Sequence, residues 1–94
     1  MNKAQELVEQ IVNEDADPLQ GAPVISSQDL TKLSTVEHKR VIAWFASKTE
    51  ADIRRRQDLV KQQTSIAYSA HNDHALANLD IMSKWLMQAM MTKC

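Results

Sequence analysis

Residues 34–70 read STVEHKRVIAWFASKTEADIRRRQDLVKQQTSIAYSA, a run that contains neither Gly nor Pro. Its apolar residues return every three or four positions, which places them on one face of a helix rather than on a strand. Ser34 and Glu37 fit a capping box, in which the Ser34 hydroxyl accepts from the backbone N–H of Glu37. The sequence therefore predicts one long helix over residues 34–70, about 54 Å from end to end.

Polar residues interrupt the apolar face in the middle of this predicted helix, at Thr49, Arg56 and Gln63. One interpretation is that the apolar stripe drifts around the helix and that Arg56 reaches out to solvent. The other is a polar layer that faces a partner helix and fixes its register at some cost in stability. The sequence leaves both interpretations open.

The rest of the chain predicts shorter elements around the long helix. Residues 1–14 predict a helix capped by Asn2, and residues 15–27 hold both prolines and the only glycine, which predicts an ordered strap. A short helical piece, capped by Ser26 or Ser27, is expected before Ser34. After a turn, Asp73 should cap a last helix over residues 74–93, antiparallel to the long one. The predicted fold is a single all-α domain, divided into an N-terminal helix (1–14), a strap (15–27) and an antiparallel helical hairpin (28–94) built from helices 34–70 and 74–93.

Composition and charge bound the class of protein. The net charge of −1 gives no overall attraction to nucleic acid or to an anionic membrane. No apolar run approaches the roughly 18 residues that a membrane span needs, and the N-terminus lacks the apolar core of a signal peptide. The single cysteine, Cys94, cannot form an internal disulfide. These features predict a cytoplasmic protein without a membrane partner.

The lengths of the two predicted hairpin helices do not match. A helix over 74–93 is about 30 Å long, so it covers only part of a helix of about 54 Å. Apolar surface on the first half of the long helix would then need cover from another chain, which predicts a homo-oligomer or docking on a protein partner. Replacing Phe45 or Ile53 with Asp should in that case dissolve the assembly. The predicted interface consists of Val41, Ile42, Trp44, Phe45, Ile53, Val60, Trp85, Met87, Met90 and Met91; for the methionines, an ordinary core is the competing interpretation.

Basic residues gather in the middle third of the chain. Residues 1–33 are acidic and residues 34–70 are basic, so the first third is expected to lie against the long helix of the same chain or of a neighbour. The residues expected to contact an anion are Lys48, Arg54, Arg55, Arg56 and Lys61. Consecutive arginines point in different directions from a helix, so local ion pairs, an acidic protein surface and phosphate all remain open as their partners.

No motif for catalysis or cofactor binding is present, and one glycine leaves no phosphate-binding loop. His71 and His74 are expected to be turn residues, because two histidines make only half of a zinc site. We therefore expect no catalytic residues, no metal and no cofactor. The predicted function is that of a non-catalytic protein-interaction protein, either a structural component of a larger assembly or a small regulator or inhibitor.

Two alternatives to this function are kept. One is nucleic-acid or nucleotide binding through the basic residues, and the other is a pocket between subunits for a small anion. In general type the chain resembles small all-helical accessory proteins of phages and mobile elements, although no motif carries this likeness. That resemblance would imply a location in the host cytoplasm or in the virion.

Overall fold

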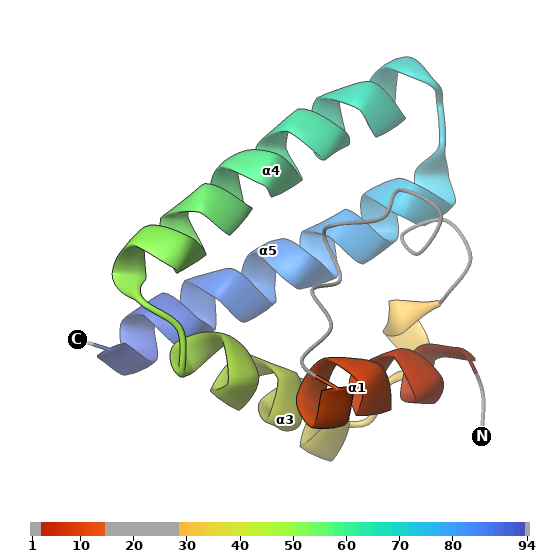
Figure 1. Cartoon of the computed structure of the whole chain (residues 1–94). Helices are drawn as coiled ribbons and strands as arrows, with labels where there is room; N and C mark the ends of the chain where they lie inside the picture. The colour runs from red at the N-terminus through yellow and green to blue at the C-terminus, as the bar shows by residue number, and fades with distance from the viewer. Residues whose placement is uncertain (1–2, 15–28, 94) are drawn as a thin grey trace.

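A computed structural model describes residues 3–14 and 29–93 of the chain, and this part is helical throughout, without strands. The elements are α1 (Lys3–Glu14), the 3-10 helix η1 (Leu30–Lys32), α3 (Thr35–Ala46), α4 (Glu50–Ser69) and α5 (Asp73–Lys93) (Figure 1). The predicted all-α class is therefore confirmed. The predicted strap over 15–27, the caps at Asn2, Ser26 and Ser27, and Cys94 lie outside the described residues.

The predicted single helix over 34–70 is wrong, because the chain breaks between α3 and α4. The N–H of Ser47 donates to the Ala43 carbonyl at 3.1 Å and closes α3. Thr49 is extended, and its hydroxyl accepts from the backbone N–H of Asp52 at 3.2 Å, as an N-cap does. Thr49 is thus the N-cap of a new helix and no part of a continuous apolar face.

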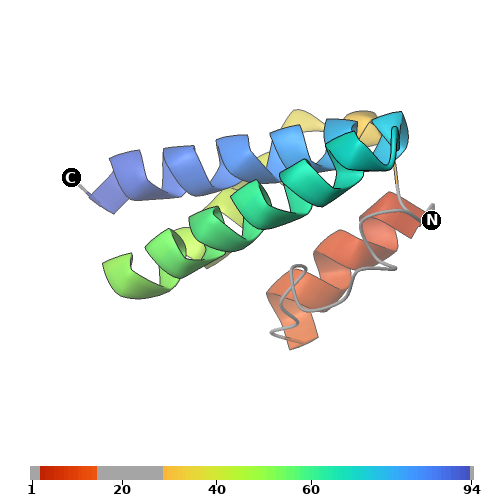
Figure 2. The ribbon, with the colours of Figure 1, turned by 90° about the horizontal axis from the view of Figure 1, so that it is seen from above.

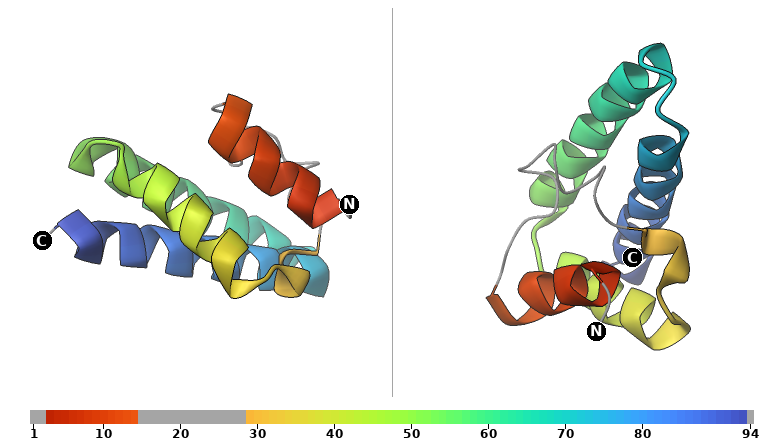
Figure 3. Two further views of the ribbon diagram at one scale, coloured as in Figure 1. Left: turned by 90° about the horizontal axis from the view of Figure 1, so that it is seen from below. Right: turned by 90° about the vertical axis from the view of Figure 1, so that its right-hand side faces the viewer.

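The helix at the centre of the molecule is α5. It contacts α3, α4 and η1, whereas α1 packs against α3. Figures 1 and 2 show α4 beside α5, running in the opposite direction. Figure 3 shows α1 alongside α3, well away from the loop that joins α4 to α5. The break before α4 lets α3 and α4 contact different sides of α5, so the predicted hairpin with one long arm does not form.

The turn between α4 and α5 is closed by backbone hydrogen bonds. The N–H of Asn72 donates to the Ala67 carbonyl at 3.0 Å, and the N–H of His71 donates to the Tyr68 carbonyl at 3.1 Å. These two bonds form a Schellman motif. His71 has φ 55, the left-handed conformation that the motif requires and that glycine usually provides. His71 therefore has a backbone role in this turn.

The N-caps of α5 and η1 are not the residues predicted from the sequence. The Asn72 side chain accepts from the backbone N–H of Ala75 at 3.1 Å, so Asn72 caps α5 and Asp73 is already helical. The Asp29 side chain accepts from the N–H of Thr31 at 3.1 Å and caps η1. The predicted cap at Ser34, in contrast, is confirmed, because its hydroxyl accepts from the N–H of Glu37 at 3.3 Å.

One hydrophobic core joins all the described elements. Trp85 of α5 and Phe45 of α3 are its largest buried side chains, and their ring centroids are 6.4 Å apart. The core consists of Leu7, Val8, Ile11, Leu30, Leu33, Val41, Phe45, Ile53, Val60, Ala67, Ala75, Leu79, Met82, Trp85, Leu86 and Ala89. Because the chain folds back after α3, it buries most of the surface that the mismatch in helix length had left uncovered. That mismatch is therefore no longer an argument for assembly.

Arg56 shows how α3 and α4 pack across the break. Its side chain is buried, and the guanidinium carbon lies 5.6 Å from the centroid of the Trp44 ring and 5.9 Å from that of Phe45. It also donates to the Asp52 carbonyl at 3.5 Å. Cation–π contacts of this kind are worth about 0.5–2 kcal/mol. Arg56 therefore does not reach solvent, and the helix that it faces belongs to the same chain.

Candidate functional site

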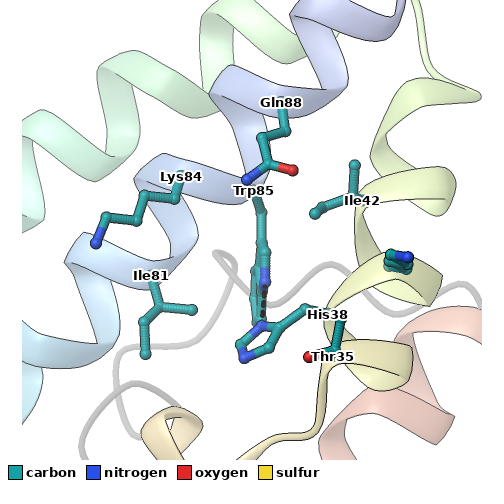
Figure 4. A pocket seen from close by; sticks show the side chains of 8 residues that line it. Thr35, His38, Ile42, Ile81, Lys84, Trp85 and Gln88 are labelled. Atoms are coloured by element: carbon teal, nitrogen blue, oxygen red, sulfur yellow. Dashed lines mark hydrogen bonds between the residues drawn. The ribbon is translucent and has the colours of Figure 1, made fainter.

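The candidate site is an open groove between α3 and α5, with a volume of about 370 Å³ (Figure 4). Each helix contributes four residues at positions i, i+3, i+4 and i+7, which is one face over two turns. The lining residues are Thr35, His38, Lys39 and Ile42 from α3, and Ile81, Lys84, Trp85 and Gln88 from α5. We call this surface the α3–α5 groove.

The floor of the α3–α5 groove is apolar and fixed by one long-range hydrogen bond. Trp85 projects from α5 toward α3, and its Nε1–H donates to Nδ1 of His38 at 2.9 Å (Figure 4). Ile42 and Ile81 are partly buried and pack against the core on either helix. An indole nitrogen can only donate, so Nδ1 of His38 must accept, and in the neutral ring the proton is on Nε2. The floor is therefore pre-organised by the folded core.

The walls of the α3–α5 groove carry positive charge. Lys39 is an exposed residue of α3, and Lys84 is an exposed residue of α5. Lys84 also pairs with Asp80, one turn earlier on α5, at 3.1 Å. Among the described residues that line the groove, none is Asp or Glu. The groove thus combines an apolar floor with cationic edges.

Two methionines on α5 are well exposed and lie outside the lining of the groove. Met87 is 56% exposed and Met91 is 68% exposed, and they are one helical turn apart. A contiguous exposed apolar patch can mark a binding surface, whereas single exposed apolar side chains are common on folded proteins. Val36, Ile66 and Tyr68 are also exposed, on α3 and on the last turns of α4.

The predicted interface residues separate into three groups in the structure. Five of them lie in the chain's own core and are not accessible, namely Val41, Phe45, Ile53, Val60 and Trp85. Ile42, Trp44 and Met90 are partly buried against that core. Met87 and Met91 are the members that remain well exposed. The groove adds Lys39, Lys84 and His38, which the sequence analysis did not select as interface residues.

The predicted anion-contact residues do not form one basic surface. Arg54 pairs with Glu50 at 2.8 Å, and Arg55 pairs with Asp52 at 3.4 Å. The other three members are also separated, with Lys48 above the Trp44 ring at 4.4 Å, Arg56 buried, and Lys61 exposed beside a shallow hollow between α4 and α5. Local pairing, one of the interpretations left open by the sequence, describes Arg54 and Arg55.

One ion pair links the acidic start of the chain to α3. Nη1 of Arg40 donates to Oε1 of Glu9 at 2.6 Å, which joins α1 to α3. This hydrogen bond lowers the pKa of the Glu9 carboxyl and raises that of the Arg40 guanidinium. The contact is of the kind expected between the acidic first third and the basic middle of the same chain.

Replacing Glu9 with Gln should reduce the loss of stability in acid. Because the pKa of Glu9 is lowered on folding, the pair stabilises the protein above the ordinary glutamate pKa of about 4.3 and loses this effect as pH falls through the lowered value. Urea unfolding of wild type and Glu9→Gln between neutral and acidic pH should therefore show two stabilities that converge. Glu6→Gln, an exposed residue of the same helix, is the control. A difference that stays constant with pH would contradict this account.

The described part of the chain lacks both a cluster of metal ligands and a membrane-spanning helix. No three His, Cys, Asp or Glu side chains lie close enough there to hold a metal ion, and His71 and His74 are exposed residues around the α4–α5 turn. None of the helices in residues 3–14 and 29–93 combines the length and hydropathy of a bilayer-crossing segment. Comparison with known proteins found no matching family model, no matching curated protein and no matching solved structure.

Proposed function

We propose that this chain is a non-catalytic helical protein-interaction protein that docks on a partner protein through the α3–α5 groove. The observation that supports it is an open apolar groove on a folded core, with Met87 and Met91 exposed on the helix that forms one wall. Pre-formed apolar grooves between two helices are a recurring binding mode for an amphipathic helix. The role is that of a structural component of a larger assembly or of a small regulator.

The dimensions of the groove suit a helical occupant. The lining residues on each helix span eight positions, from i to i+7, a length of about 10 Å. An amphipathic helix presents apolar side chains at i, i+3 or i+4, and i+7 over the same distance. The exposed methionines of α5 can adapt to the shape of a partner, because their side chains are unbranched and flexible. The floor needs no rearrangement, since Trp85 is already held by His38.

Nucleic-acid or nucleotide binding, the alternative from the sequence, stays a prediction that no structural observation favours. Stacking of bases needs exposed aromatic faces, and Trp85 at the groove floor is 2% exposed. Arg54 and Arg55 are engaged with carboxylates of their own helix.

Site-specific photo-crosslinking in the cells that make the protein tests the proposed function. A benzophenone amino acid placed at Met87 or at Met91 should give one defined adduct with another protein. The same group at Ile66, which is equally exposed but lies at the far end of α4, is the control and should give none. No adduct at Met87 and Met91, or an adduct at Ile66 alone, would refute docking at this surface. An adduct of twice the chain's own mass would indicate self-association in its place.

A further inference from the structure

We infer that the segment bound by the α3–α5 groove is an acidic amphipathic helix. Its apolar ridge would contact Ile42 and Ile81, and carboxylates on either side of that ridge would pair with Lys39 on one wall and Lys84 on the other. This inference rests on the proposed function and adds the chemistry of the partner. An acidic helix is chosen because its negative charge would complement Lys39 and Lys84.

The charges of the groove are of one sign. Lys39 and Lys84 are on opposite walls, and the described lining contains no carboxylate to neutralise them. Lys39 forms no ion pair with any other residue in the described part of the chain. Lys84 has Asp80 as its partner, but both side chains of this pair are two-thirds exposed. Exposed pairs of this kind stabilise a protein only weakly, so a partner carboxylate can replace Asp80 at little cost.

His38, an uncharged polar group of the groove, also favours an acceptor on the occupant. Nδ1 of His38 already accepts from Trp85, so the nitrogen left to the groove is the donor Nε2–H of the neutral ring. Thr35 and Gln88 can each donate or accept, so they accommodate an acceptor without selecting for one. A carboxylate can only accept, and it therefore matches lysines and neutral donors together, whereas a basic segment would meet like charge.

The same features favour a protein helix over a nucleic acid as the source of negative charge. The accessible floor is formed by the aliphatic Ile42 and Ile81, and the Trp85 ring is buried in the core. Among its described lining residues, the groove offers bases no exposed Trp, Tyr or Phe ring to stack on, whereas leucine-like side chains of a helix would fit between the two isoleucines. The groove is also only about two helical turns long, which is short for tracking a phosphate backbone.

Selection from a displayed library of amphipathic helices tests the inference. The library keeps one apolar ridge and randomises the flanking positions among Asp, Glu, Lys, Arg, Ser and Gln. Against the wild-type chain, the enriched sequences should carry Asp or Glu on both flanks of the ridge. A selected peptide should perturb the amide signals of the α3–α5 groove, and its affinity should fall about tenfold for the double variant Lys39→Glu/Lys84→Glu. A basic peptide should instead be enriched on that variant.

The control variant is Lys61→Glu, which makes the same change of charge at an exposed site on α4, outside the groove. It should leave the affinity of the selected peptides unchanged. The inference is overturned if no sequence is enriched, if enriched sequences show no acidic bias, or if Lys61→Glu weakens binding as much as the groove variant does. A single-stranded oligonucleotide that binds at the groove and competes with the peptide would also overturn it. A crosslink at Met87 without acidic preference in the library would retain the proposed function and reject only this inference.

Discussion

Replacing Phe45 with Ala should lower the free energy of unfolding by about 3–5 kcal/mol, the cost of emptying a buried aromatic site. Phe45 is 0% exposed, and its ring lies 5.0 Å from the centroid of Trp44 and 6.4 Å from that of Trp85. A chain of this length is expected to have a total stability of only about 5–14 kcal/mol, so the loss is a large fraction of it. Urea titration followed by circular dichroism would measure the change. Met87→Ala, an exposed control, should stay within about 0.5 kcal/mol of wild type.

This experiment also separates a core position from an interface position. From the sequence alone, Phe45→Asp is expected to dissolve an assembly of folded chains. The structure leads to a different expectation, in which a buried carboxylate at this site unfolds the chain itself. A Phe45 variant that kept the wild-type unfolding curve but changed the native mass would contradict the position of Phe45 in the core.

Replacing Asn78 with Leu should cost about 1–3 kcal/mol, although the two side chains have similar size. Asn78 is completely buried on α5, and its Oδ1 accepts from the backbone N–H of Leu30 at 3.1 Å. Leucine would leave that buried N–H without its acceptor and would remove the bond that joins η1 to α5. Hydrogen exchange should therefore speed up at Leu30 beyond the general loss of stability.

The matched control for this variant is Gln62→Leu, which makes a comparable amide-to-leucine change at an exposed position of α4. It should leave both the unfolding curve and the exchange of the Leu30 amide unchanged. Equal exchange rates at Leu30 in wild type and Asn78→Leu would show that this hydrogen bond does not secure η1.

The starts of α3 and α5 could be predicted from the sequence, because capping residues mark both of them. Ser34 with Glu37 predicted the start of α3 correctly, and the Asn72–Asp73 pair located the start of α5 to within one residue. The break before α4 had a similar signal in Thr49 and Asp52, which fit the pattern of a cap followed by an acidic third residue. The absence of Gly and Pro from residues 34–70 favours a continuous helix instead, which is why the sequence predicts no break there. A helix can end without glycine, however, as Ser47 shows.

The candidate site could not be predicted to the same extent. Helical periodicity identifies the apolar face of each helix, but it does not tell which two faces meet. Apolar residues such as Ile53 and Val60 therefore looked the same whether their cover was to come from the chain itself or from another molecule. Lys39 and Lys84 are ordinary exposed lysines in the sequence, and only the packing of α3 on α5 makes them opposite walls of one groove.

Trp85 belongs both to the core and to the floor of the α3–α5 groove, and this double role constrains how the surface can diverge among descendants of the same gene. A change at Trp85 that altered the shape of the floor would also disturb Phe45 and the bond to His38. Residues at the edges of the groove, such as Lys39 and Gln88, are exposed, so substituting them would not disturb the core. Drift toward a new partner should therefore begin with substitutions at the edges and leave the tryptophan in place.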